Sequence, residues 1–294
     1  MEPEGENIMY KDEIGLEVDR SRCTRCGLCV ADCRNKAIVA DPASGYPVVA
    51  PDGGAERCMH CQHCMMLCPV GALSVDGVDV AACPAAGQNL PSYSSLLDLV
   101  RSRRSCRDYL QKNVEKEVIA ELLDAMRYVP TGVNRRGLHF ALIDNLEVME
   151  QYRKRTYEKI CSMKESGTLP ENQIRLYEQF MDGSDPVFRT APHLLVVSVA
   201  EDSFCAEADP LIAVSYFELL AHARGLGTVW FGRWMSMWRS LLPEMKDVMG
   251  IPEGYRPGYA ILFGYASPKQ KFVRAGCPDP VPVRSVTADD LKGY

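Results

Sequence analysis

The chain has 294 residues, a net charge of -6 and an apolar fraction of 47%, which suit one small and one medium-sized domain. The negative charge argues against a nucleic-acid partner, because neutralising phosphates requires a basic surface. No uninterrupted run of about twenty apolar residues occurs, so no membrane span is expected. The start, Met1 to Asn7, lacks the basic and apolar segments of an export signal and predicts a cytoplasmic protein.

Eight of the 13 cysteines fall in two runs of identical spacing, C-x2-C-x2-C-x3-C. The runs are Cys23, Cys26, Cys29, Cys33 and Cys58, Cys61, Cys64, Cys68. Three thiolates at two-residue gaps can hold an iron-sulfur cubane, and the fourth cysteine of each run then reaches the other cluster. The spacing therefore predicts two [4Fe-4S] clusters, one on Cys23, Cys26, Cys29 and Cys68, and the other on Cys58, Cys61, Cys64 and Cys33.

Other roles for these cysteines fit less well. Disulfide bonds suit small secreted domains, which the missing export signal argues against. Zinc ribbons use pairs of C-x2-C, and the extra step inside each run has no place there, so zinc stays the weaker alternative. A c-type haem is excluded because Gln62, not histidine, follows Cys61. Outside the runs, Cys83 is a candidate accessory ligand.

The pattern resembles a bacterial-type ferredoxin domain with two [4Fe-4S] clusters, over about residues 17–76. The second run ends in Cys68-Pro69, as the family pattern does, whereas the first ends in Cys33-Arg34. The nearby histidines, His60 and His63, are expected to adjust hydrogen bonding to sulfur rather than to bind iron.

Short strands are expected in the first region at residues 17–19 and 45–51, and residues 70–75 close that region. Residues 76–91 are rich in Gly, Ala and Pro and lose all periodicity, which indicates a boundary. We therefore predict a cluster domain at residues 1–80, a linker at 81–91 and a second domain at 92–294.

The second domain is predicted to mix helices and strands. Apolar residues between Val118 and Met126 recur at helical spacing, with Asn113 as the predicted cap and Pro130 as the end. Residues 139–143, 194–199 and 258–264 are short apolar runs that predict strands, and the charged stretch 147–181 predicts two solvated helices. This combination indicates an α+β fold.

A further helix is predicted to open with Asp209 as its cap and Pro210 in its first turn, and to stop at Gly225. Its body, residues 211–221, is apolar on nearly every side. Such a helix is expected within a core or at a subunit interface. The tryptophans at 230, 234 and 238 fall four apart, a stripe expected to serve packing or an interface.

Four segments of the second domain suit a planar cofactor that carries a phosphate. Arginine guanidinium groups and a hydroxyl that fit phosphate oxygens come from Arg103, Arg104, Ser105 and Arg107. A turn contributes Thr131, Gly132 and Asn134, and a glycine-bounded stretch that lets the backbone approach a flat ring contributes Val229, Trp230, Phe231 and Gly232. Additional positive charge comes from Lys269 and Lys271. Taken alone, the arginine run is better interpreted as a solvated basic face.

In this order the segments resemble the nitroreductase family of FMN-dependent reductases, from about Tyr93 to Arg274. The resemblance implies a homodimeric α+β domain with a central mixed sheet flanked by helices, and FMN at the interface. It implies that the arginine-serine run and the late lysines hold the FMN phosphate, that the 131–134 turn approaches the flavin from the partner subunit, and that residues 229–232 pass the flavin N5. Many members have glutamate where this chain has Phe231, and residues 135–138 also depart from the family pattern.

Together, the two resemblances imply an oxidoreductase. A reduced ferredoxin is the expected donor, the two clusters and FMN carry the electrons, and a small organic molecule such as a nitroaromatic, a quinone or an activated alkene is the acceptor. A specialised member that makes or breaks a bond, and a non-catalytic electron carrier or redox sensor, stay open as alternatives. No side chain is singled out as a general acid.

Overall fold

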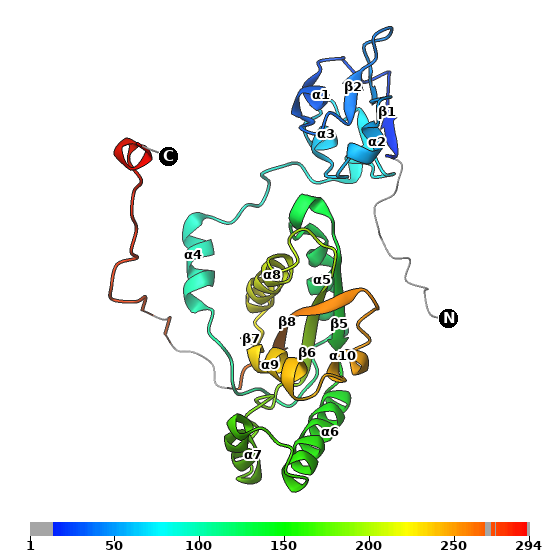
Figure 1. Cartoon of the computed structure of the whole chain (residues 1–294). Helices are drawn as coiled ribbons and strands as arrows, with labels where there is room; N and C mark the ends of the chain where they lie inside the picture. The colour runs from blue at the N-terminus through cyan, green and yellow to red at the C-terminus, as the bar shows by residue number, and fades with distance from the viewer. Residues whose placement is uncertain (1–13, 268–271, 274, 293–294) are drawn as a thin grey trace.

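The computed structural model describes residues 14–267, 272–273 and 275–292 (Figure 1). Residues 16–75, here called the cysteine-rich region, contain short strands and helices: β1 Leu16–Val18, α1 Leu28–Asp32, β2 Ile38–Ala40, β3 Pro47–Val49, α2 Gly54–Arg57, α3 His63–Met66 and β4 Leu73–Val75. β1 pairs with β4 and β2 pairs with β3, both antiparallel. Because these elements are so short, the fold of this region depends on loops that carry the cysteines.

Residues 93–267, here called the α+β region, are built on one sheet. Its strands are β5 Leu138–Ile143, β6 His193–Ala200, β7 Gly227–Trp230 and β8 Tyr255–Gly264, in the order β5-β6-β8-β7. These neighbours are antiparallel, and a parallel bridge from Ser105 to Thr228 adds mixed pairing at the β7 edge. All eight residues of β6 are buried, so this strand lies at the centre of the region.

Helices cover both faces of the sheet (Figure 1). They are α4 Tyr93–Ser102, α5 Lys116–Ala125, α6 Leu146–Glu165, α7 Ile174–Met181, α8 Asp209–Ala223, α9 Gly232–Ser240 and α10 Met245–Val248. Single 3-10 turns lie at Val80–Ala82, Met126–Tyr128, Gly132–Asn134, Glu171–Gln173 and Ala288–Leu291. None of the helices in the described residues has the length and apolar character that a membrane crossing requires.

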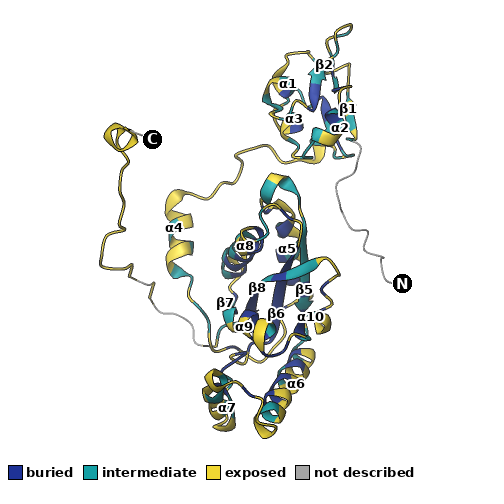
Figure 2. Cartoon of the chain, viewed as in Figure 1, coloured by how far each residue is buried: buried dark blue, intermediate teal, exposed yellow. Residues whose placement is uncertain are grey.

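The two faces of β6 enter two different cores, because successive strand residues point to opposite sides. Leu194 and Val196 pack in the core beneath α6 and α9, and Leu195 and Val197 pack in the core beneath α5 and α8. Figure 2 shows β6 dark blue between these layers, whereas β5, β7 and the start of β8 are partly teal. The predicted α+β class, with a sheet flanked by helices, is confirmed.

Two predicted helix caps are wrong. Asn113 does not cap α5, because the cap residue of that helix is Glu115. Instead, Asn113 Oδ1 accepts a hydrogen bond from the amide of Leu146 at 2.7 Å. Asp209 lies in the first turn of α8, after Ala208, and its carboxylate accepts from the amide of Gly132 at 2.9 Å. In both cases a distant amide competes successfully with the local one.

Other local predictions agree with the structure. Gly225 follows α8 with φ of 78°, a left-handed conformation that suits glycine at a helix end. The tryptophan stripe packs into the core: Trp234 is fully buried, and its Nε1 donates to the hydroxyl of Tyr152 at 2.9 Å.

Candidate functional sites

The eight cysteines of the two runs line two cavities in the cysteine-rich region. The larger, about 160 Å³ and here called the Cys58 cavity, is lined among other residues by Cys33, Cys58, Cys61 and Cys64. The smaller, about 60 Å³ and here called the Cys23 cavity, is lined by Cys23, Cys26, Cys29 and Cys68. Each cavity takes three cysteines from one run and the fourth from the other, the same partition that the spacing predicts.

The donor set of these cavities suits a multinuclear cluster. Four thiols line each cavity, the number of ligands that a [4Fe-4S] cluster takes. Burial raises the pKa of Cys64 to about 11 and also raises the pKa of Cys29 and Cys58. Thiolates at these positions therefore need a positive partner such as iron, and binding it would release their protons.

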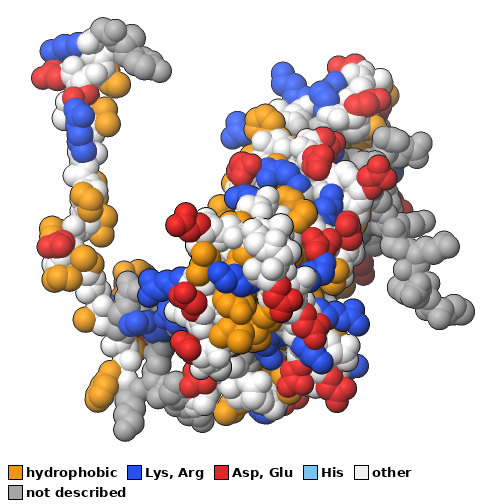
Figure 3. Space-filling view, turned by 60° about the horizontal axis from the view of Figure 1, so that its bottom comes forward, with side chains coloured by type: hydrophobic (Ala, Val, Ile, Leu, Met, Phe, Trp, Pro, Cys, Tyr) orange, Lys and Arg blue, Asp and Glu red, His pale blue; other side chains and the backbone are white. Residues whose placement is uncertain are grey.

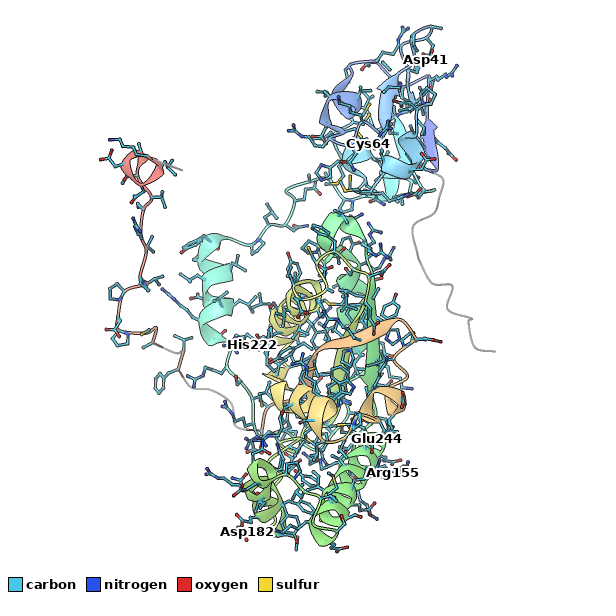
Figure 4. The ribbon with its side chains drawn as sticks, in the orientation of Figure 1. Asp41, Cys64, Arg155, Asp182, His222 and Glu244 are labelled. Carbon is cyan, nitrogen blue, oxygen red and sulfur yellow. The ribbon has the colours of Figure 1, made fainter. Side chains whose placement is uncertain are left out.

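Backbone amides donate hydrogen bonds to three of the cysteine sulfurs. Cys58 Sγ accepts from the amide of His60 at 3.3 Å, Cys33 Sγ from Ala37 at 3.2 Å, and Cys68 Sγ from Ala72 at 3.2 Å. Hydrogen bonds of this kind stabilise negative charge on sulfur and adjust the potential of iron-sulfur clusters. Figure 4 labels Cys64 within this region.

The histidines near the cysteines pair with carboxylates. His60 Nδ1 lies 2.7 Å from Asp76 Oδ2, and His63 Nδ1 lies 3.2 Å from Asp32 Oδ2. Cys83 lies outside both cavities and is exposed, with its Sγ 3.7 Å from the carbonyl of Asp79.

Two of the predicted cofactor segments meet at the β7 edge of the sheet. Ser105 forms its parallel bridge with Thr228, and the amide of Cys106 donates to the carbonyl of Thr228 at 2.7 Å. A Cβ on Gly227 would lie 2.7 Å from Cys106 Sγ, so only glycine allows this approach. The arginine-serine run is thus an extra strand-like segment beside β7.

The arginines of this run have different surroundings. Arg103 is half-buried, and its Nη1 donates to Glu218 Oε1 of α8 at 3.2 Å, an atom that also accepts from Thr228 Oγ1 at 3.2 Å. Arg104 and Arg107 are exposed, and neither pairs with a carboxylate among the described residues. Their positive charge is therefore available at this edge. Lys269 and Lys271 lie outside the described residues.

Of the four predicted residues at 229–232, three are accessible. Phe231 is 3% exposed and packs edge-on against Phe188, with ring centroids 5.5 Å apart. Val229, Trp230 and Gly232 are half-buried. The position where many family members have glutamate is therefore part of the core in this chain, and its side chain adds nothing polar to the surface.

The third predicted segment, the turn with Thr131, Gly132 and Asn134, lies elsewhere. Gly132 contacts Asp209 at the start of α8, whereas Arg103 contacts Glu218 nine positions later. At 1.5 Å per residue these contacts are about 14 Å apart along the helix axis. Asn134 Nδ2 donates to the carbonyl of Met59 in the cysteine-rich region at 2.7 Å. No sequence pattern predicts this contact.

Cysteines around two cavities and an α+β sheet with a basic edge define an iron-sulfur protein joined to an oxidoreductase-type domain. Two family comparisons agree: residues 22–72 match the 4Fe-4S dicluster domain, and residues 100–265 match the nitroreductase family. The second match spans more than half of the chain, so the protein belongs to the nitroreductase family and is a nitroreductase-like oxidoreductase.

Individual relatives and solved structures match about three fifths of the chain. A Methanothermobacter thermautotrophicus protein with the provisional name NADH dehydrogenase/NAD(P)H nitroreductase is 28% identical over 174 residues, 59% of this chain and 78% of the relative. An Archaeoglobus fulgidus protein with the same provisional name is 23% identical over 179 residues, 61% of this chain and 90% of the relative. The crystal structure of a Desulfitobacterium hafniense nitroreductase with bound FMN superposes with a TM-score of 0.52 at 23% identity, covering 65% of this chain and 98% of the other. This last likeness shows the shared fold.

Proposed function

We propose that the protein is an iron-sulfur flavoprotein that takes electrons from a low-potential donor, most simply a reduced ferredoxin, and delivers them through two [4Fe-4S] clusters and FMN to a small organic acceptor. Nitroaromatics, quinones and activated alkenes are the proposed acceptor classes. The observation that carries this proposal is the division of eight cysteines between two cavities in a chain of the nitroreductase family.

The proposed ligands are the four cysteines of each cavity. Amides at His60, Ala37 and Ala72 would hold the sulfurs in position and balance part of their charge. The described cysteines form no disulfide bonds, which suits a reducing compartment, and we propose the cytoplasm. We also propose domain limits of 1–80 and 92–294 with a linker at 81–91; β4 ends at Val75 and α4 begins at Tyr93.

The proposed FMN site lies at the β7 edge. Arg104 and Arg107 would hold the phosphate, with Ser105 beside them, and Glu218 keeps the guanidinium of Arg103 in one place. The half-buried backbone from Val229 to Gly232 would lie along the ring, and the buried Phe231 excludes water behind it. FMN, when bound, supplies the exchange between one-electron and two-electron transfer.

A homodimer completes this proposal. The 131–134 turn and the arginine run contact α8 about 14 Å apart, so within one protomer they face different places. α8 also exposes Leu211, Tyr216 and Leu220, and no residue of α4 is buried. Figure 2 shows α4 largely yellow, and Figure 3 shows exposed hydrophobic side chains along the C-terminal segment, which includes the exposed Val281 and Val283. Apolar surfaces of this kind are typical of association sites.

The experiment that tests the proposal combines composition with a variant. Anaerobically purified protein should contain iron, sulfide and FMN and should elute as a dimer. The Cys29→Ala variant should lose ferredoxin-driven reduction of a nitroaromatic compound, while flavin reduced directly by dithionite should still react with it. Equal loss of both activities would contradict the proposed relay, and zinc in place of iron and sulfide would refute the cluster assignment. A flavin that no organic acceptor reoxidises would identify an electron carrier instead.

A further inference from the structure

The turn at residues 131–136 contacts the cysteine-rich region through a hydrogen bond between residues 75 positions apart. Asn134 Nδ2 donates to the backbone carbonyl of Met59 at 2.7 Å. Met59 also lines the Cys58 cavity and does not line the Cys23 cavity. Figure 1 shows the turn that follows α5 directly beneath the cysteine-rich region. One short loop therefore forms a cavity wall on one side and a contact with the α+β region on the other.

The loop that contains Met59 needs support, because its backbone is strained. His60 and Gln62 have φ values of 47° and 60°, in the left-handed region that residues with a Cβ rarely adopt. The loop is held by the bond from the His60 amide to Cys58 Sγ and by the pair of His60 with Asp76. The hydrogen bond from Asn134 holds the carbonyl of Met59, the residue between Cys58 and His60.

The turn that presents Asn134 is strained as well. Val133, Asn134 and Arg136 all have positive φ, at 48°, 56° and 54°, and valine is a branched residue that rarely adopts this conformation. Such strain persists only where the surroundings over-determine the backbone, and it is concentrated at functional positions.

One hydrogen bond to α8, one hydrogen bond within the turn and close packing against the loop before α8 hold the turn in place. The amide of Gly132 donates to the buried carboxylate of Asp209 at 2.9 Å, and the amide of Arg136 donates to Thr131 Oγ1 at 2.9 Å. A Cβ on Gly132 would lie 2.6 Å from Cys205 Sγ, so the turn packs tightly against the loop before α8. The Asn134 amide is therefore aimed by a rigid support.

We propose that the 131–136 turn is a latch that fixes the wall of the Cys58 cavity to the α+β region, with Asn134 as its positioning residue. This proposal goes beyond the proposed function. It assigns the contact between the cysteine-rich region and the α+β region to the 131–136 turn, and it assigns the cavity at that contact as the Cys58 cavity. The structural part of the inference is independent of any cofactor, and only its spectroscopic test rests on the proposed function.

The test uses the full chain and three variants. Asn134→Asp keeps the shape of the side chain and the tolerance for positive φ, but its carboxylate cannot donate to Met59. Asn134→Gly removes the side chain, also tolerates positive φ, and serves if the charge of the aspartate disturbs folding. The matched control is Asn89→Asp, which makes the same change at an exposed residue with φ of 62° in the proposed linker.

Hydrogen-deuterium exchange of the backbone amides is the first readout. We expect exchange in the peptide that covers residues 58–62 to be several-fold faster in both Asn134 variants and unchanged in Asn89→Asp. The β2–β3 pair at residues 38–49 serves as the internal reference and should not change. Wild-type exchange at residues 58–62 in both Asn134 variants would overturn the latch.

The EPR spectrum of the dithionite-reduced protein is the second readout. A change in one cavity wall should alter the signal of one cluster in both Asn134 variants and leave Asn89→Asp like the wild type. Faster exchange with an unaltered spectrum would overturn the positioning role and leave only a structural contact. If wild-type protein shows no iron-sulfur signal, the proposed function fails, whereas the exchange result still decides whether the latch exists. Loss of bound flavin with wild-type exchange would assign Asn134 to the flavin instead.

Discussion

Arg103 Nη1 lies 3.2 Å from Glu218 Oε1, and this pair joins the predicted phosphate-binding run to the middle of α8. Glu218 is 7% exposed, and its Oε1 also accepts from Thr228 of β7. The residue before Arg103 makes a second contact with α8: Ser102 Oγ lies 2.8 Å from His222 Nε2. Figure 4 labels His222 beside the end of α4. The proposed phosphate edge is thus held by polar contacts with one helix.

We expect Glu218→Ala to destabilise the α+β region by about 3 kcal/mol, because it leaves the half-buried charge of Arg103 and the hydroxyl of buried Thr228 without their acceptor. Glu218→Gln keeps an acceptor and should cost less. Urea denaturation followed by tryptophan fluorescence measures this, since all three tryptophans lie in the α+β region.

The exposed ion pair of Arg224 with Glu121 provides the control, because both side chains are about half exposed. Glu121→Ala removes one partner of a pair in water and should change the free energy of unfolding by less than about 1 kcal/mol. Equal effects of Glu121→Ala and Glu218→Ala would show that the Glu218 contacts contribute no more than a surface pair.

Part of this site was predictable from the sequence. The partition of the cysteines follows from local spacing, since one run of C-x2-C-x2-C-x3-C already restricts which sulfurs can share a cavity. Glu218 is also marked in the sequence, because it is the single acidic residue in the apolar stretch 211–221 and needs a polar partner if it is buried. Its partners, Arg103 and Thr228, could not be read from spacing.

The wrong predictions share a cause. Asn113 and Asp209 are good helix caps by residue type. The side-chain oxygen of each nevertheless accepts a hydrogen bond from an amide that is distant in sequence, that of Leu146 for Asn113 and that of Gly132 for Asp209. Local propensity is a weak prior where a distant donor competes. The contact between Asn134 and Met59 belongs to the same class, because it depends on how two regions lie together.

The second prediction concerns pH. His193 is fully buried beside Phe263, and its Nε2 accepts from the amide of Val114 at 2.9 Å. Burial lowers the pKa of His193 to about 4, below its ordinary value of about 6.5. Because the unfolded chain then binds a proton that the folded chain does not, the stability contributed by neutral His193 is present above pH 6.5 and is lost as the pH falls toward 4.

Replacing this residue should flatten that pH dependence. His193→Gln keeps an acceptor for Val114 and cannot titrate, so the stability advantage of the wild type over the variant should shrink by roughly 3 kcal/mol between pH 7 and pH 4. Denaturant unfolding of both proteins at several pH values measures the difference. Parallel pH profiles for the two proteins would contradict the assignment.

The third prediction tests the close packing of the 131–136 turn. Gly132→Ala would place a methyl group 2.6 Å from Cys205 Sγ, so we expect a destabilisation of about 1–3 kcal/mol from overpacking. Gly137→Ala is the matched control, because the nearest atom to its new methyl group is Ala200 Cβ at an ordinary 3.5 Å. Thermal unfolding by circular dichroism compares them. A larger effect at Gly137 than at Gly132 would mean that the turn yields easily.

The fourth prediction uses iron counts to test which cysteines share a cavity. If Cys23 and Cys68 line the same cluster site, Cys23→Ala, Cys68→Ala and the double variant should each lose about four irons per chain, because all three changes damage one [4Fe-4S] site. Cys64 lines the other cavity, so the variant that combines Cys64→Ala with Cys68→Ala should lose about eight irons. Iron and sulfide assays on anaerobically purified protein give the numbers. A pairing by run would invert the pattern: the Cys64 and Cys68 changes would then cost no more together than singly, and the Cys23 and Cys68 changes would add.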